Sequence, residues 1–248
     1  MRHASVYSHR GKIGLVTPAT NTVNEAEWTR LMPDGVTFHA QRMVLRGGSH
    51  SEAEVLDQIA DAGEVLARAD VDVIAYACTA GSMVTPAGGL EQAASARAGR
   101  PVVTTAAAIV AALGALGATR VAIATPYHEA LNDHERDFLS GHGIRTLAIR
   151  GLGIGAGGPA EYPQIARTPL DRVRALALEV HDPDAEALLL TCTDFPTLPL
   201  IPELEAELGI PVVSSNTVTL WAALRAAGIN DRINDAGRLL TLTSARKD

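Results

Sequence analysis

Short apolar runs alternate with amphipathic segments along most of this chain. Residues 12–18 form an apolar run that stops at a Thr-Pro pair, which is typical of a buried strand leading into a turn. Residues 51–68 begin with acidic residues and then place apolar residues every three or four positions, the spacing of a helix with one buried face. In the first half the pattern predicts strands at 12–18, 36–45, 73–78 and 101–105, with helices opening at 24 and covering 51–68, 90–98 and 106–116.

The pattern then starts again, which indicates an internal duplication. Residues 120–126 repeat the residue classes of 12–18 at an offset of 108. Two more blocks recur in the same order, at offsets of 114 and 110: Cys192-Thr193 after Cys78-Thr79, and 209–215 after 99–105. Three blocks in one order predict two copies of a half of about 110 residues.

Strands that alternate with helices predict an α/β fold. Right-handed crossovers make such sheets mainly parallel, so each half should be a three-layer, Rossmann-like lobe with about four strands. Ligands bind beyond the carboxyl ends of the strands in open α/β sheets. We therefore expect two lobes related by a pseudo-twofold axis, with the active site in the cleft between them.

The chain contains two cysteines, Cys78 and Cys192, and both follow an apolar run that ends in turn-forming residues. An isolated buried cysteine usually behaves as a small hydrophobic residue. These two occupy matching positions of the duplicated halves, which favours a functional pair facing one substrate. The turns that follow them offer backbone N–H groups, and such groups favour the thiolate form.

Two facing thiols permit two related reactions on a small carboxylate. One thiol can remove an α-proton while the other returns a proton to the opposite face, which is racemisation. Alternatively, one thiol adds to an activated double bond, holds the adduct while the single bond rotates, and leaves again, which is cis-trans isomerisation. Neither route requires a metal or an organic cofactor, so we expect none.

Hydroxyl and amide side chains gather at the same predicted strand ends. They suit an anionic substrate held by hydrogen bonds rather than by salt bridges. Each of them alone is as well explained as a helix cap or turn residue, and it is their shared placement that favours binding. The candidate substrate-binding residues are Thr17, Asn21, Thr79, Ser82, Tyr127 and Thr193.

Composition excludes several other classes of function. The net charge of -7 and the lack of a basic run argue against a nucleic-acid partner. No apolar run reaches the roughly 18 residues that span a bilayer, and the N-terminus is polar, so we expect a cytoplasmic protein without membrane contact. A homo-oligomer is the expected assembly for such an enzyme. A disulfide is not expected in a reducing compartment.

Four motifs together resemble the maleate cis-trans isomerase and arylmalonate decarboxylase branch of the aspartate/glutamate racemase superfamily. The resemblance runs from about 12 to 228. The motifs are Val16-Thr-Pro-Ala-Thr-Asn21-Thr with Glu25, Ala77-Cys78-Thr-Ala-Gly-Ser82, Pro126-Tyr127, and Thr191-Cys192-Thr193.

This resemblance implies two Rossmann-like lobes and a cofactor-independent mechanism. The C-terminal helix would return to the first lobe, so that 1–117 and 214–248 form one lobe and 118–213 the other. The motifs would make Cys78 the nucleophile, Cys192 the partner acid/base, and Asn21 and Tyr127 contacts to a substrate carboxylate.

The expected function is thus that of a cofactor-independent cis-trans isomerase of a small carboxylate. The alternatives are a two-cysteine amino-acid or hydantoin-type racemase, an arylmalonate-type decarboxylase, and a non-catalytic two-lobed binding protein. The decarboxylases that resemble this chain keep only the second thiol.

Two features depart from the pattern of the isomerases. Asp194 would repel a second substrate carboxylate unless it pairs or points away, and the glycine-rich stretch 151–159 lacks the asparagine with which the isomerases bind that carboxylate. The Gly153-x-Gly155-x-x-Gly158 spacing in that stretch precedes Pro159 rather than a helix, which argues against a dinucleotide loop.

Overall fold

The chain forms two four-stranded parallel sheets with the same strand order. The computed structural model describes residues 2–44, 52–83 and 89–243. The sheets have the orders β2-β1-β3-β4 and β6-β5-β7-β8, so the second sheet repeats the first with every strand number raised by four. Every strand pair is parallel. The predicted α/β class, the two similar lobes and the four strands in each are confirmed.

The first sheet and its helices come from the first half of the chain. The strands are β1 (Gly11–Pro18), β2 (Val36–Met43), β3 (Val73–Tyr76) and β4 (Val102–Thr104). The helices are α1 (Asn24–Leu31), α2 (Glu52–Ala67), α3 (Thr79–Ser82), α4 (Gly89–Ala98) and α5 (Thr105–Leu116). The predicted elements match these bounds to within about two residues, although residue 45 of one predicted strand and residue 51 of one predicted helix lie outside the described residues.

The second half builds the second sheet. Its strands are β5 (Arg120–Tyr127), β6 (Arg145–Ile154), β7 (Ala187–Leu190) and β8 (Val212–Ser214). Its α-helices are α6 (Glu129–Gly141), α7 (Leu170–Val180), α8 (Ile201–Leu208) and α9 (Ser215–Ala226). Short 3-10 segments, η1 (Pro159–Arg167), η2 (Leu198–Leu200) and η3 (Arg238–Thr241), fill the connections.

Local sequence explains where the central elements begin and end. All four residues of β3 and all four of β7 are buried, as expected for parallel strands covered by helices on both faces. The Thr104 side chain accepts a hydrogen bond from the Ala107 amide and caps α5, and Gly117 ends that helix in the left-handed conformation. A capping box between Ser214 and Thr217 starts α9 in the same way.

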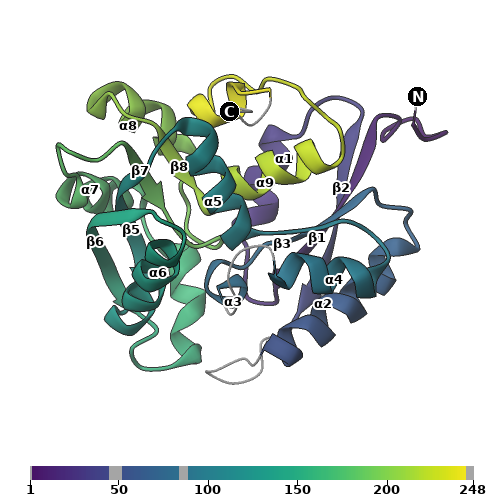
Figure 1. The fold of residues 1–248 in the computed structure, drawn as a ribbon, viewed down its shortest axis with the longest axis horizontal. Helices are drawn as coiled ribbons and strands as arrows, with labels where there is room; N and C mark the ends of the chain where they lie inside the picture. The colour runs from purple at the N-terminus through teal and green to yellow at the C-terminus, as the bar shows by residue number, and fades with distance from the viewer. Residues whose placement is uncertain (1, 45–51, 84–88, 244–248) are drawn as a thin grey trace.

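Helices α5 and α9 pack on each other between the two sheets (Figure 1). One continuous apolar cluster runs from β3 through α5 and α9 to β5, and it includes Val73, Ile109, Leu220 and Ile123. Two further clusters lie on the outer faces, one under α2 and α4 and one under α7 and α8. Helix α9 contacts β3, β4 and α1 of the first lobe as well as β8. In the described part of the chain no helix combines the length and the apolar character that a membrane crossing requires.

Candidate active site

Cys78 lies at the carboxyl end of β3, where the chain turns into the short helix α3. Its exposed fraction is 7%, and its backbone is extended, with φ of -146°. Burial raises the pKa of the thiol, while the hydrogen bond of the Gly81 amide and the nearby Tyr76 hydroxyl lower it. Burial has the larger effect, so the pKa is above its usual value and Cys78 is a thiol at neutral pH. The predicted N–H donor is present, yet it does not by itself produce a thiolate.

Cys192 occupies the equivalent place after β7 but differs in backbone conformation. Its φ is 97°, a region that residues other than glycine rarely adopt, and its amide donates to Ser215 Oγ at 3.0 Å. Burial raises the pKa of the thiol to about 12 against the hydrogen bonds of Tyr127 and of the Asp194 amide, with smaller upward contributions from the Asp194 and Cys78 charges. Cys192 is therefore held as a thiol that can donate a proton.

Tyr127 is the last residue of β5, and both cysteines influence the pKa of its hydroxyl. Its exposed fraction is 6%, and its hydroxyl hydrogen-bonds with the Cys192 side chain. Burial raises the pKa of the phenol well above its usual value, and the charges of Cys192, Glu135 and Cys78 add to that increase. The phenol therefore stays protonated and is a hydrogen-bond donor. Both thiols contribute to the pKa of the phenol, so the side chains of Cys78, Cys192 and Tyr127 lie near one another.

Asn21 and Thr193 join the first lobe to the second beside the cysteines. Asn21 Nδ2 donates to Thr193 Oγ1 at 3.0 Å, and that hydroxyl donates to the Ala77 carbonyl oxygen at 3.0 Å. The Asn21 carbonyl oxygen accepts from the amides of Val23 and Asn24. The second N–H of Asn21 Nδ2 has no protein partner in the described part of the chain, whereas the Thr193 hydroxyl has two partners.

The hydroxyl groups of the remaining candidate binding residues differ in how many hydrogen bonds they make within the protein. Thr79 Oγ1 lies 2.8 Å from Ser215 Oγ, which also accepts the Cys192 amide, so this pair links the two cysteine turns. Ser82 Oγ donates to the Thr79 carbonyl and accepts the Ala106 amide, both at 3.0 Å, and is used within the first lobe. Thr17 Oγ1 is buried without a hydrogen-bond partner among the described residues. Their contact with a substrate stays a prediction.

Comparison with known proteins shows which family this chain belongs to. The sequence model of the family described as "Arylmalonate decarboxylase" matches residues 13–240, which is most of the chain. This chain belongs to the arylmalonate decarboxylase family. The match confirms the family resemblance that the four sequence motifs indicated.

Individual members of the family are similar over nearly their full length. A maleate isomerase of Pseudomonas putida is 31% identical over 252 residues, which cover 93% of this chain and 97% of that protein. An arylmalonate decarboxylase of Bordetella bronchiseptica is 31% identical over 220 residues, covering 87% and 90%. A solved structure of the Nocardia farcinica maleate cis-trans isomerase is also similar, with a TM-score of 0.83 and 30% identity. The match covers 93% of this chain and 98% of that one. That structure is of a cysteine-to-serine mutant with a covalently bound succinylcysteine intermediate.

The Asp194 carboxylate accepts hydrogen bonds from backbone amides. Its Oδ1 accepts the Thr22 amide at 2.8 Å, and the Val23 amide also hydrogen-bonds to the carboxylate. Burial raises the pKa of Asp194 to about 6 against these two bonds. The carboxylate thus pairs with the loop before α1, and pairing is one of the two arrangements under which repulsion of a second substrate carboxylate is not expected.

The glycine-rich stretch does not offer a free phosphate site. It forms the end of β6 and a turn into η1, and Glu161 Oε2 accepts the amides of Gly155 and Gly157 at 2.8 and 3.2 Å. A dinucleotide loop would need those amides for its pyrophosphate. Within the described residues no three His, Cys, Asp or Glu side chains group to hold a metal ion.

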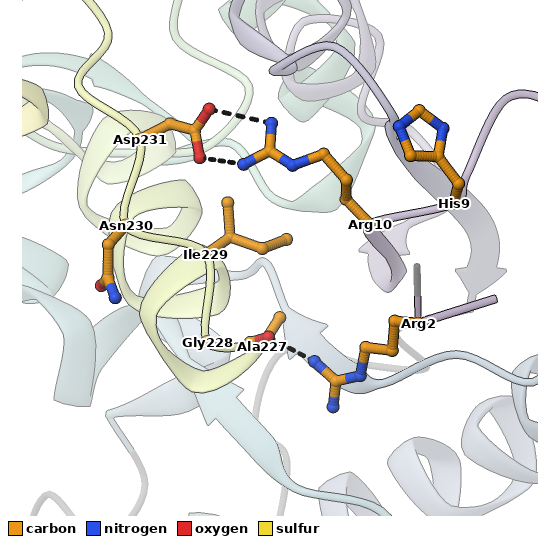
Figure 2. A pocket seen from close by; sticks show the side chains of 8 residues that line it. All are labelled: Arg2, His9, Arg10, Ala227, Gly228, Ile229, Asn230 and Asp231. Atoms are coloured by element: carbon orange, nitrogen blue, oxygen red, sulfur yellow. Dashed lines mark hydrogen bonds and ion pairs between the residues drawn. The ribbon is translucent and has the colours of Figure 1, made fainter.

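An open pocket of about 510 Å³ lies at the other end of β1, near the carboxyl end of α9 (Figure 2). Its two arginines are already paired. Arg10 makes a bidentate ion pair with Asp231, and Arg2 donates to the Ala227 carbonyl oxygen. These contacts fasten the N-terminal segment to the chain after α9, so we assign this pocket no part in catalysis.

Two buried glutamates, Glu27 of α1 and Glu135 of α6, were not predicted from the sequence. They are related by the same offset of 108 as β1 and β5, and each follows a buried asparagine by three positions, Asn24 and Asn132. Extending the repeat into the helices would have found them. Glu27 bonds across to the second lobe, whereas Glu135 Oε2 accepts the Thr191 hydroxyl at 3.0 Å and its Oε1 has no partner among the described residues.

The state of Glu135 predicts how stability depends on pH. Burial raises the pKa of Glu135 to about 8, against the Thr191 hydrogen bond, from an ordinary value of 4.5. Between these two pH values the folded protein binds more protons than the unfolded chain, so stability falls as the pH rises, by at most about 1.4 kcal/mol per pH unit. Glu135→Gln mimics the protonated acid and should flatten this decline. Thermal unfolding from pH 5 to 9 measures it, with the exposed Glu203→Gln as control; equal slopes in both variants would contradict the prediction.

Proposed function

We propose that this protein is a cofactor-independent cis-trans isomerase of a maleate-like dicarboxylate, with Cys78 as the nucleophile and Cys192 as the acid and base. The observation that carries the proposal is that the two cysteines follow the equivalent central strands β3 and β7, with Tyr127 hydrogen-bonded to Cys192 and close to Cys78. The maleate isomerase of Pseudomonas putida and the succinylcysteine bound in the Nocardia farcinica relative support the same chemistry.

The reaction balances with these two thiols alone. Cys78, once it has lost its proton to solvent, adds its sulfur to one alkene carbon, and the π electrons move to the other carbon as an enolate. Cys192 donates its proton to that carbon, which leaves a succinyl thioether with a freely rotating single bond. After rotation the Cys192 thiolate takes the proton back, the double bond forms again, and the Cys78 thiolate leaves.

The protonated state of Cys192 follows from its burial and from the charge beside it. A thiol with a pKa of about 12 is a proton donor at neutral pH, and the Asp194 charge nearby disfavours a resting thiolate. The protonated Tyr127 phenol can donate to an enolate oxygen, and the spare Asn21 N–H to a carboxylate. We assign these two residues to substrate binding on that basis.

A second candidate reaction is decarboxylation of an arylmalonate. It is favoured by the 31% identity to the Bordetella bronchiseptica decarboxylase. Loss of carbon dioxide would leave an enolate at the same carbon, and the same Cys192 thiol would protonate it. This route uses no covalent bond to Cys78, so the two reactions predict different intermediates.

Proton NMR in heavy water with a panel of substrates tests the proposal. Maleate should yield fumarate, and the thioether on Cys78 should appear as a mass increase of one substrate under acid quench. A racemase would return aspartate, glutamate or a hydantoin with deuterium at the α-carbon, and a decarboxylase would release carbon dioxide from an arylmalonate. Either result without maleate turnover contradicts the isomerase, as does ligand binding without turnover of any compound in the panel.

A further inference from the structure

A phenol lies behind the proposed nucleophile, on the same strand. Tyr76 and Cys78 are two positions apart at the end of β3, and side chains at that spacing point to the same face of a strand. The Tyr76 side chain is fully buried in the cluster beneath α2 and α4. The equivalent residue of the second lobe is Leu190, so the duplication does not account for the hydroxyl.

The Tyr76 hydroxyl has no regular hydrogen-bond partner among the described residues. Leaving a buried hydroxyl unpaired costs about 1–3 kcal/mol, and buried phenols usually find a partner. A hydroxyl kept at this cost requires an explanation, and a catalytic role is one of those that buried unpaired groups have.

Gly81 brings the phenol and the thiol together. A methyl group at Gly81 would lie 2.9 Å from Cys78 Sγ and closer still to the Tyr76 oxygen, so both atoms border the space left by the missing side chain. The two groups also influence each other: Tyr76 lowers the pKa of Cys78, and Cys78 raises the pKa of Tyr76, whose largest increase comes from burial. The thiol is therefore the group within reach of the unpaired hydroxyl.

We propose that Tyr76 is a positioning residue for the nucleophile, which donates its phenolic hydrogen to the sulfur of Cys78 when that sulfur is a thiolate. The proposal rests on the assignment of Cys78 as nucleophile. A neutral thiol is a weak acceptor, whereas an anion makes a stronger, charge-assisted bond. The orphan hydroxyl of the resting protein thus gains its partner on ionisation. The Gly81 amide is the second donor to the same sulfur.

The groups around the two thiols differ in a way that fits two roles. Cys78 Sγ and the Tyr76 hydroxyl both lie next to Gly81, whereas Tyr127 and Asp194 lie near Cys192. Cys192 has the acidic Asp194 beside it, at the position where the first lobe has Ala80. Each cysteine thus has a phenol and a backbone amide as donors, and Cys192 has in addition a carboxylate beside it that favours its protonated form.

The pKa of Cys78 tests this proposal without any substrate. In a Cys192→Ser background Cys78 is the one remaining thiol, and its alkylation by iodoacetamide at a series of pH values reports the thiolate fraction by peptide mass. Tyr76→Phe should reduce the alkylation rate at pH 8 roughly tenfold and move the profile to higher pH by about one unit, as loss of one charge-assisted bond implies. Tyr7→Phe, on a ring that is 80% exposed, is the matched control.

Activity and stability separate positioning from a merely structural role. In the chain with both cysteines, Tyr76→Phe should lower kcat about tenfold with KM within twofold, and its Tm should not fall because the removed hydroxyl is unpaired. An alkylation profile that coincides with that of Tyr7→Phe overturns the proposal, whether or not the protein isomerises maleate. Should Tyr76→Phe fail to fold, 3-fluorotyrosine at position 76, a stronger donor of nearly the same size, should shift the profile to lower pH, and an unshifted profile would again overturn it.

Discussion

Replacing Cys78 by alanine is expected to reduce isomerisation of maleate by more than about a thousandfold, the scale of losing a covalent nucleophile. Without the sulfur the double bond is never interrupted, and the remaining Cys192 thiol can only protonate. The side chain is small and buried, and its removal takes an acceptor from the Gly81 amide while leaving the rest of the packing in place. We therefore expect the folded protein to persist. Proton NMR of fumarate formation and far-UV circular dichroism measure the two effects.

Cys192→Ser is the matched variant, because it removes the other thiol of the duplicated pair. It should also stop turnover, but Cys78 can still add to the substrate, so the protein mass should increase by one maleate after incubation. Cys78→Ala should show no such adduct. Turnover within tenfold of the parent protein in Cys78→Ala would exclude covalent isomerisation and favour an acid-base route through Cys192.

Replacing Glu27 by alanine is expected to produce the largest loss of stability, roughly 3–5 kcal/mol, because three buried donors lose their acceptor at once. The Glu27 carboxylate accepts the amides of Thr197 and Leu198 at 2.7 and 2.8 Å and the Asn216 side-chain amide at 2.7 Å. Asn216 cannot turn to compensate, since its oxygen accepts from Asn24 Nδ2 at 2.6 Å. The free energy of unfolding of a whole domain is only about 5–15 kcal/mol, so this loss is a large fraction of it.

Urea unfolding followed by circular dichroism measures this loss. Glu25→Ala is the matched control on the same helix, because Glu25 is partly exposed and makes a surface ion pair with Arg42, an interaction worth at most about 1 kcal/mol. Free energies of unfolding that agree within 1 kcal/mol for the two variants would show that the contacts of Glu27 across the lobes do not stabilise the fold.

The two unequal cysteines illustrate how a duplicated site becomes asymmetric. Both lie at carboxyl ends of central strands, yet Cys192 is held at a positive φ and Cys78 is extended. One phenol comes from its own strand and the other from the neighbouring β5. Offsets along the chain show that the two positions correspond, but they do not reveal that the surroundings differ.

Periodicity was sufficient for the elements and their order. The apolar runs that became β3 and β7 are buried on both faces, so they read as strands without knowledge of their neighbours. The repeat of the Thr-Pro and Cys-Thr blocks predicted two similar lobes, because each copy carries its own local signals for turn and helix. Tyr76 lies inside such an apolar run, so periodicity predicts a buried side chain and nothing about its hydroxyl.

The sequence by itself determined the α/β class, the duplication and the choice of Cys78 and Cys192, since each depends on the order of residues along the chain. The tertiary structure alone decided three other features: that Asp194 pairs with the Thr22 and Val23 amides, that Glu27 joins the two lobes, and that the Tyr76 hydroxyl lies unpaired beside Cys78. The reason is physical. Burial, pKa and hydrogen bonding depend on groups that lie close in space, and the partners of Asp194 and Glu27 are about 170 positions away in the sequence.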